Sequence, residues 1–166
     1  MVETKWSFPT SGRERTGFLN IYGGDVMSVV NMVRNIKDLF PDYIVLVKIG
    51  TFFESYNNDA YIMSYIFQYK LKTLISYDTT CGFPTSSIKR IKSILESRSV
   101  NYLIVDKKHN YEEIEKMNYK KKNKYNEILP KANEYIDRIN RIDKIHKYLN
   151  NNPDKIQIVE EVLYER

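Results

Sequence analysis

The sequence of 166 residues contains one cysteine and two histidines, and this scarcity excludes several kinds of site. A single cysteine, Cys81, cannot form an intramolecular disulfide or a zinc cluster of several cysteines. We therefore interpret Cys81 as a small, semi-buried residue. His109 and His146 lie in different regions, without a carboxylate or thiol at metal-ligand spacing. We expect no metal site and no catalytic constellation.

The sequence also lacks the motif of a nucleotide-binding enzyme and the long apolar run of a membrane protein. A Walker-type loop needs Gly-x-x-x-x-Gly followed by Lys and then Ser or Thr, and this pattern is absent. No stretch approaches the roughly 18 apolar residues of a membrane span, and residues 1–6 do not resemble a signal peptide. We expect a cytoplasmic, non-enzymatic chain that uses no cofactor and enters no membrane.

The charge balance is mildly basic, with a net charge of +5 at pH 7 and a pI of about 9.1. Such a surplus suits a nucleic-acid partner, because phosphate binding needs exposed Lys and Arg side chains. Many soluble proteins reach the same balance. The charge therefore permits nucleic-acid binding without establishing it.

The composition divides the chain into three regions. Residues 1–24 contain a proline and four glycines, which predict a poorly ordered arm. Residues 25–110 alternate between helical and strand-like patterns, which predict a compact α/β unit. Residues 111–166 are more highly charged and predict a helical tail.

The hydrophobic periodicity of residues 25–110 switches repeatedly between helix and strand. Apolar residues at helical spacing after Asp25 predict a helix that ends at Pro41, and the run Tyr43–Ile49 predicts a strand buried on both faces. The other expected elements are a turn at Gly50-Thr51, a helix at Asp59–Tyr69, a strand at Lys70–Ser76, a turn at Asp78–Thr80, a helix at Ser87–Ser97 and a last strand at Val100–Val105. The alternation predicts the α/β (α+β) class, with a small mixed sheet flanked by helices.

The tail has the texture of amphipathic helices. Residues Glu112–Lys116 open a charged helix that Pro130 is expected to interrupt. From Ala132 to Leu149 the apolar residues recur at three- and four-residue steps, which places them on one helical face. After a break at Asn150–Pro153, a shorter amphipathic segment closes the chain. This pattern predicts a C-terminal helical hairpin or an oligomerisation arm.

One segment, Gly50-Thr51-Phe52-Phe53-Glu54, suits a particular chemistry. It follows a buried strand and a glycine turn, so we expect it at an edge of the sheet. An exposed aromatic ring can act as a wedge between base pairs, at a lower cost where the pairing is already weak. Phosphates repel a carboxylate, so Glu54 becomes useful only if it bonds to a base edge. From residue types alone, a buried aromatic pair beside a solvated Glu54 is the better interpretation.

The same segment resembles the Gly-x-Phe-Tyr-Glu signature of the N-terminal domain of MutS-type mismatch repair proteins. The resemblance continues at Asn58-Asp59-Ala60 and at Gly82-Phe83-Pro84, which is similar to the family's Gly-Ile/Val-Pro, and it covers about residues 25–110. It implies a MutS domain I-like fold in which Phe52 stacks on a mispaired base and Glu54 hydrogen-bonds to that base. Phe53 then points into the core.

Other residues complete the expected site. The residue pattern predicts that Gly50, Gly82 and Pro84 shape structural turns. On electrostatic grounds we add four phosphate contacts, for which ordinary solvated surface is an equal alternative: Lys48, Lys89, Arg90 and Lys92.

The sequence departs from the family at Thr51, where an Asp is usual, and at Ser55, which replaces an apolar residue. We expect a stand-alone domain without the ATPase and the other MutS domains. Two functions follow. The first is a DNA-binding module for mismatched or distorted duplexes that serves another enzyme, with the helical tail giving homo-oligomers or docking a protein partner. The second is a protein-interaction or oligomerisation module that keeps the fold without DNA binding.

Overall fold

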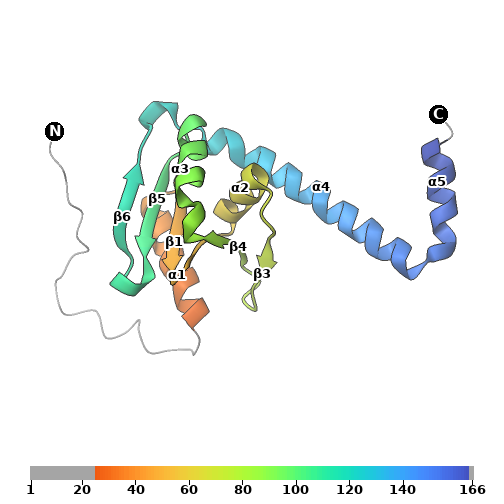
Figure 1. Ribbon diagram of the computed structural model, residues 1–166, viewed down its shortest axis with the longest axis horizontal. Helices are drawn as coiled ribbons and strands as arrows, with labels where there is room; N and C mark the ends of the chain where they lie inside the picture. Colours follow the sequence, from red (N-terminus) through yellow and green to blue (C-terminus); the bar gives the residue numbers. More distant parts are fainter. Residues whose placement is uncertain (1–24, 165–166) are drawn as a thin grey trace.

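The computed structural model describes residues 25–164 of the chain, so the arm predicted for residues 1–24 lies outside the described residues. A six-stranded mixed sheet forms the centre, with the strand order β3-β4-β2-β1-β5-β6. Helices cover both faces of the sheet, and one long helix continues well beyond it (Figure 1). The predicted α/β class, with a small mixed sheet flanked by helices, is confirmed. The strands are β1 (Ile44–Ile49), β2 (Phe52–Tyr56), β3 (Lys72–Thr73), β4 (Thr79–Pro84), β5 (Tyr102–Asp106) and β6 (Glu112–Met117).

Strand β1 lies in the middle of the sheet and is buried on both faces, as its continuous apolar run predicts. It pairs in parallel with β5 and antiparallel with β2. Its side chains alternate between two hydrophobic clusters: Ile44 and Leu46 belong to one, and Val45 and Val47 to the other. All four are fully buried.

Helix α1 (Asp25–Leu39) covers one face of the sheet with Val29, Val30, Val33 and Ile36. Helices α2 (Asn58–Phe67), α3 (Ile88–Ser97) and the start of α4 (Tyr125–Asn151) cover the other. The three helices predicted between residues 25 and 97 are therefore confirmed, with small differences at their ends. The last helix, α5 (Ile156–Tyr164), follows a break at Asn152 and a short 3-10 helix at Pro153–Lys155.

The region between α2 and β4 differs from the prediction. The predicted strand over Lys70–Ser76 is wrong: only Lys72 and Thr73 form a strand, β3, which pairs with β4 alone. The predicted turn at Asp78–Thr80 is also displaced: Thr79 and Thr80 are strand residues, and the turn spans Leu74–Asp78. Ile75 and Tyr77 are almost fully exposed in this turn. The strand was predicted from the alternation at Leu71 and Thr73, but the chain turns away after Thr73 and only two residues pair with β4.

The charged helix predicted at Glu112–Lys116 is wrong, because these residues form β6. Asn110 and Tyr111 both adopt positive φ angles, of 54° and 58°, and turn the chain back along β5. Antiparallel pairing with β5 then overrides the helical propensity of the local sequence. A charged edge strand is typical of natural sheets, since charge discourages pairing with other chains. The strand Val100–Val105 is present as β5 but is not the last strand, and the sheet extends beyond residue 110.

Pro130 does not interrupt the helix that contains it. It is exposed in the second turn of α4, and the helix continues through it to Asn151. The first half of α4 is part of the folded domain, because Tyr125, Ile128, Ala132 and Ile136 are buried against α2 and the sheet. Within residues 25–164, no helix is both long enough and apolar enough to cross a membrane.

A buried polar cluster joins α4 to the domain. The Asp59 carboxylate is 1% exposed and accepts hydrogen bonds from the Lys37 ammonium group at 2.9 Å and the Tyr125 hydroxyl at 2.6 Å. Its second oxygen accepts from the backbone N–H of Val45 at 2.9 Å. Lys37 also donates to the carbonyl of Tyr43 at 2.6 Å. The cluster therefore connects α1, α2, β1 and α4 at one point.

Candidate nucleic-acid interface

A tight hairpin between β1 and β2 carries the residues singled out in the sequence. Gly50 and Thr51 form the turn, and Ile49 pairs with Phe52 directly across it. Gly50 has a φ angle of +59°, in the left-handed region that suits glycine, so the predicted turn at this residue is confirmed. Phe52 is the first residue of β2 and its side chain is 51% exposed. The expected position at a sheet edge is wrong, since β2 lies between β1 and β4 and Phe52 stands at its end.

Side chains alternate along β2 and separate the two aromatic residues. Phe53 points to the α2–α3 face, where its ring stacks on Phe83 at a centroid distance of 5.6 Å. Phe52, Glu54 and Tyr56 point to the opposite face, since successive strand residues alternate in direction. The prediction that Phe53 belongs to the core is confirmed. Phe52 and Glu54 share one face and lie two residues apart.

The Glu54 carboxylate is held by a neighbour rather than fully solvated. Its Oε2 atom accepts a hydrogen bond from the Tyr56 hydroxyl at 2.5 Å. Tyr56 is 4% exposed, and burial followed by this hydrogen bond raises its pKa far above the usual value. The hydroxyl therefore stays protonated and remains a donor at any physiological pH. Tyr56, which the sequence analysis did not identify, fixes the orientation of Glu54. Its position could have indicated this role, because residues two apart in a strand point to the same face.

Strand β4 borders this face with an exposed residue that has no side chain, Gly82. Gly82 pairs with Glu54 and Pro84 pairs with Phe52. A Cβ atom at Gly82 would come within 3.5 Å of the Glu54 Cγ atom, so any longer side chain there would lie against Glu54. Glycine inside a strand often marks a close approach by a ligand or another backbone. Gly82 lies within the strand rather than in a turn, which corrects the predicted turn role, and Pro84 ends β4 before a short 3-10 helix at Thr85–Ser87.

The four basic residues predicted to contact phosphate do not share one surface. Lys89 and Arg90 are exposed in the first turn of α3. A few residues earlier, the backbone N–H of Thr85 donates a 2.9 Å hydrogen bond to the carbonyl of Thr51 in the hairpin turn. Lys48 lies on the face opposite Phe52 and its ammonium group is 3.6 Å from the Asp106 carboxylate. Lys92 forms a 2.6 Å ion pair with Glu115 on β6. Helix α3 packs on the same face of the sheet as Lys48, so Lys89 and Arg90 do not lie on the face of Phe52 and Glu54 either. They differ from Lys48 and Lys92 in having no acidic partner among the described residues.

A further basic segment, Lys107–His109, follows β5. Because β5 is parallel to β1, this segment lies at the same end of the sheet as the hairpin turn. Burial alone would raise the pKa of Asp106, but hydrogen bonds from His109 and from the backbone of Lys108 outweigh it and lower the pKa. The sequence analysis did not select these residues, although two lysines directly after a strand gave a signal.

Nothing at this face suggests covalent or metal chemistry. Cys81 is fully buried, and burial raises the pKa of its thiol to about 12, so it has the character of an inert core residue. Among residues 25–164, no group of three or more His, Cys, Asp and Glu side chains could hold a metal ion. The exposed groups of the face offer stacking, hydrogen bonding and positive charge.

The fold and this face are those of a small α/β binding domain. The family model described as MutS domain I matches residues 28–127. This match covers more than half of the 166 residues, so the chain belongs to the MutS domain I family, whose domains bind DNA without catalysis and serve mismatch recognition in DNA repair. The resemblance identified in the sequence is confirmed, and the match continues through β6 to the start of α4. No curated protein matches the chain.

Proposed function

We propose that the protein recognises mismatched or distorted duplex DNA by inserting Phe52 as a wedge while Glu54 hydrogen-bonds to the displaced base. The observation that carries this proposal is the pairing of a half-exposed aromatic ring with a restrained carboxylate on one face of β2. A wedge must unstack one base step, which costs a few kcal/mol in normal duplex and less at a mispair. Selectivity for weak steps follows from that difference.

Glu54 supplies the second part of the recognition. Phosphates repel its carboxylate, so it adds little to general DNA affinity and instead favours a duplex in which a base edge can reach it. Only its Oε2 atom takes part in the hydrogen bond from Tyr56. Gly82, which pairs with Glu54, is exposed and carries no side chain that could cover the other oxygen.

General affinity comes from a small number of cations. We propose Lys89 and Arg90 as the main phosphate contacts, because both are exposed at the start of α3, shortly after Pro84 pairs with Phe52, and neither forms an ion pair within the described residues. We assign smaller parts to Lys48 and Lys92, which are paired with Asp106 and Glu115. Non-specific affinity grows with the number of phosphates contacted. We expect weak binding, so the protein acts as an accessory to an enzyme on another chain.

Replacement of Phe52 tests the wedge directly. Base stacking on an aromatic side chain contributes about 1–3 kcal/mol per base, so Phe52→Ala should remove roughly 5-fold or more of the preference for a heteroduplex while leaving homoduplex binding almost unchanged. Fluorescence anisotropy at low salt, with a G·T or single-base-bulge duplex against a matched homoduplex, measures both.

The matched control is Ile114→Ala on β6. The side chain of Ile114 is also 51% exposed, so its replacement removes a similar apolar surface, but from the far edge of the sheet. An equal effect of the two substitutions, or no measurable duplex binding by the wild type, contradicts the proposal. The second outcome favours the alternative of a protein-interaction module.

Replacement of Tyr56 tests whether Glu54 must be held in place. Tyr56→Phe removes only the hydroxyl, and we expect the heteroduplex preference to fall roughly 3- to 10-fold, equivalent to about 0.7–1.4 kcal/mol. In a Glu54→Ala background the same substitution should have no further effect, because the hydroxyl then has no carboxylate to orient. Anisotropy titrations of the wild type, the two single variants and the double variant complete this double-mutant cycle. Equal losses in both backgrounds would show that Tyr56 acts through the core instead.

A further inference from the structure

The C-terminal part of the chain leaves the domain and exposes an apolar surface. We call residues 140–164 the arm: the second half of α4 and all of α5 (Figure 1). Ile136 is the last buried residue of α4, and no residue of the arm is buried. Nine of the fourteen large apolar side chains that are exposed in the described residues belong to the arm. Monomeric proteins rarely expose apolar side chains in such a concentration, so the arm is an interaction surface.

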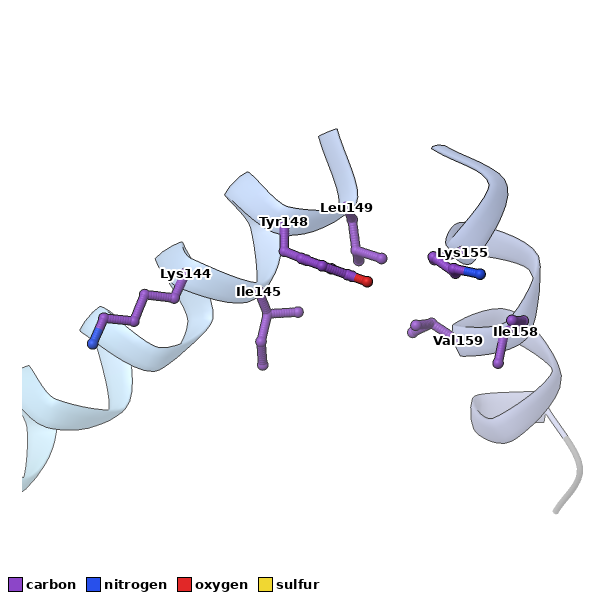
Figure 2. Close-up of a pocket in the computed structure, with 7 residues that line it drawn as sticks. All are labelled: Lys144, Ile145, Tyr148, Leu149, Lys155, Ile158 and Val159. Atoms are coloured by element: carbon purple, nitrogen blue, oxygen red, sulfur yellow. The ribbon is translucent and has the colours of Figure 1, made fainter. Parts of the chain in front are cut away.

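The two helices of the arm do not bury these side chains against each other. Figure 2 shows Ile145, Tyr148 and Leu149 of α4 facing Ile158 and Val159 of α5 across an open cleft. The cleft has a volume of about 340 Å³, which is room for several side chains. Ile145, Ile158 and Val159 remain 57%, 53% and 37% exposed. A further apolar element, such as a helix, would fill the cleft and exclude water from both walls.

The charges of the arm identify the helix that fits. Residues 140–147 of α4 carry Arg141, Lys144 and Lys147 against the single acidic residue Asp143. Helix α5 carries Glu160 and Glu161 and has no basic residue. No ion pair within the described residues joins these two sets. The arm is thus self-complementary: its α5 is an apolar helix of the right charge to lie on the α4 of another copy.

We infer that the arm is a dimerisation element, and that the occupant of its cleft is α5 from a second copy of this chain. In a two-fold pair each copy gives the same patch, so both clefts are filled at once and each α5 places Glu160 and Glu161 beside Arg141 and Lys144 of its partner. The four arm helices then form a small bundle with an apolar centre. The dimer carries two copies of the hairpin face, and its formation does not depend on DNA binding.

Sedimentation equilibrium of the full chain, without DNA, tests this inference. We expect a dimer that dissociates on dilution. The paired substitutions Glu160→Lys with Glu161→Lys should weaken it at least 10-fold, because the reversed charges then face the basic residues of the partner's α4. Arg141→Glu with Lys144→Glu should weaken it similarly. A mixture of the two variants should form a heterodimer of nearly wild-type affinity, since both of its clefts again pair opposite charges.

The control is Lys121→Glu with Lys122→Glu, an exposed basic pair outside the arm, which should leave the dimer unchanged. Circular dichroism checks that each variant keeps its fold, which is expected because no arm residue is buried. A wild-type chain that stays monomeric up to about 200 µM overturns the inference, and so does a mixture that fails to associate. If the chain is a monomer in which α5 packs against its own α4, the cleft is filled within one copy. If it is a monomer that binds another protein through the arm, the occupant is a different partner.

Discussion

Replacing Lys37 with methionine is expected to lower the free energy of unfolding by about 3–5 kcal/mol, because it leaves the Asp59 carboxylate buried without its cation. Lys37 donates to Asp59 at 2.9 Å, and the carboxylate is 1% exposed. Burial raises the pKa of Asp59, while Lys37 and the hydrogen bonds from Tyr125 and Val45 act in the opposite direction. Without Lys37, only the neutral donors of Tyr125 and Val45 oppose the effect of burial on the pKa of Asp59. Urea unfolding, followed by circular dichroism, measures the change.

A matched control is Lys92→Met. Lys92 and Lys37 have similar side-chain exposures, 28% and 22%, and both form close ion pairs. The partner of Lys92, Glu115, is 35% exposed, so water can solvate it after the substitution. We expect a loss of at most about 1 kcal/mol, as for surface pairs. Equal losses for the two variants would contradict the role assigned to burial.

The double substitution Lys37→Met with Asp59→Asn separates the buried charge from lost packing. The amide of Asn is neutral: its one oxygen can accept from the Val45 backbone N–H, while its Nδ2 group can donate to the Tyr125 hydroxyl oxygen. We expect the double variant to be more stable than Lys37→Met alone, since it no longer buries an unpaired charge. If it is less stable, the loss in the single variant comes from the contacts of the Lys37 stem.

The second large effect concerns the point where the folded domain ends. A chain that stops at residue 110 is expected to show no cooperative unfolding transition, because it lacks β6 and the first half of α4. Strand β5 would lose its antiparallel neighbour and become an exposed edge. The core would lose the buried side chains of Tyr125, Ile128, Ala132 and Ile136.

A chain that stops at Asn140 is the matched comparison. It retains β6, the packed half of α4 and the hydrogen bond from Tyr125 to Asp59. We expect its melting temperature to be close to that of the full chain, since the arm contributes no buried residue. Thermal unfolding by circular dichroism compares the three lengths. A cooperative transition in the chain that stops at residue 110 would mean that β6 and α4 are accessory to the core.

The same observations bear on the domain boundary that the sequence predicts after residue 110. We propose instead that the folded unit runs from Asp25 to about Ile139 and that the rest of the tail is the arm. The sequence pattern changes near residue 111 because β6 is a charged edge strand, and not because the domain ends there. A composition change marks solvent exposure, which edge strands and linkers share.

The local sequence determined the elements whose cause is local. The apolar run at Tyr43–Ile49 defines β1, Gly50 supplies the positive φ of the hairpin turn, and the helical spacing after Asp25 defines α1. The sequence also determined the family, since the match over residues 28–127 does not depend on coordinates. Alternation along a strand was sufficient to separate Phe52 from Phe53 once the strand was known.

Only the tertiary structure decided the rest, because the causes lie far apart in the chain. Glu112–Met117 forms a strand because β5 offers it backbone partners. The place of Phe52 and Glu54 beside Gly82 depends on the pairing of β2 with β4, and the core position of α4 depends on Asp59 meeting Tyr125. Local propensities amount to tenths of a kcal/mol per residue, so a sheet partner or a buried polar contact from a distant segment overrides them.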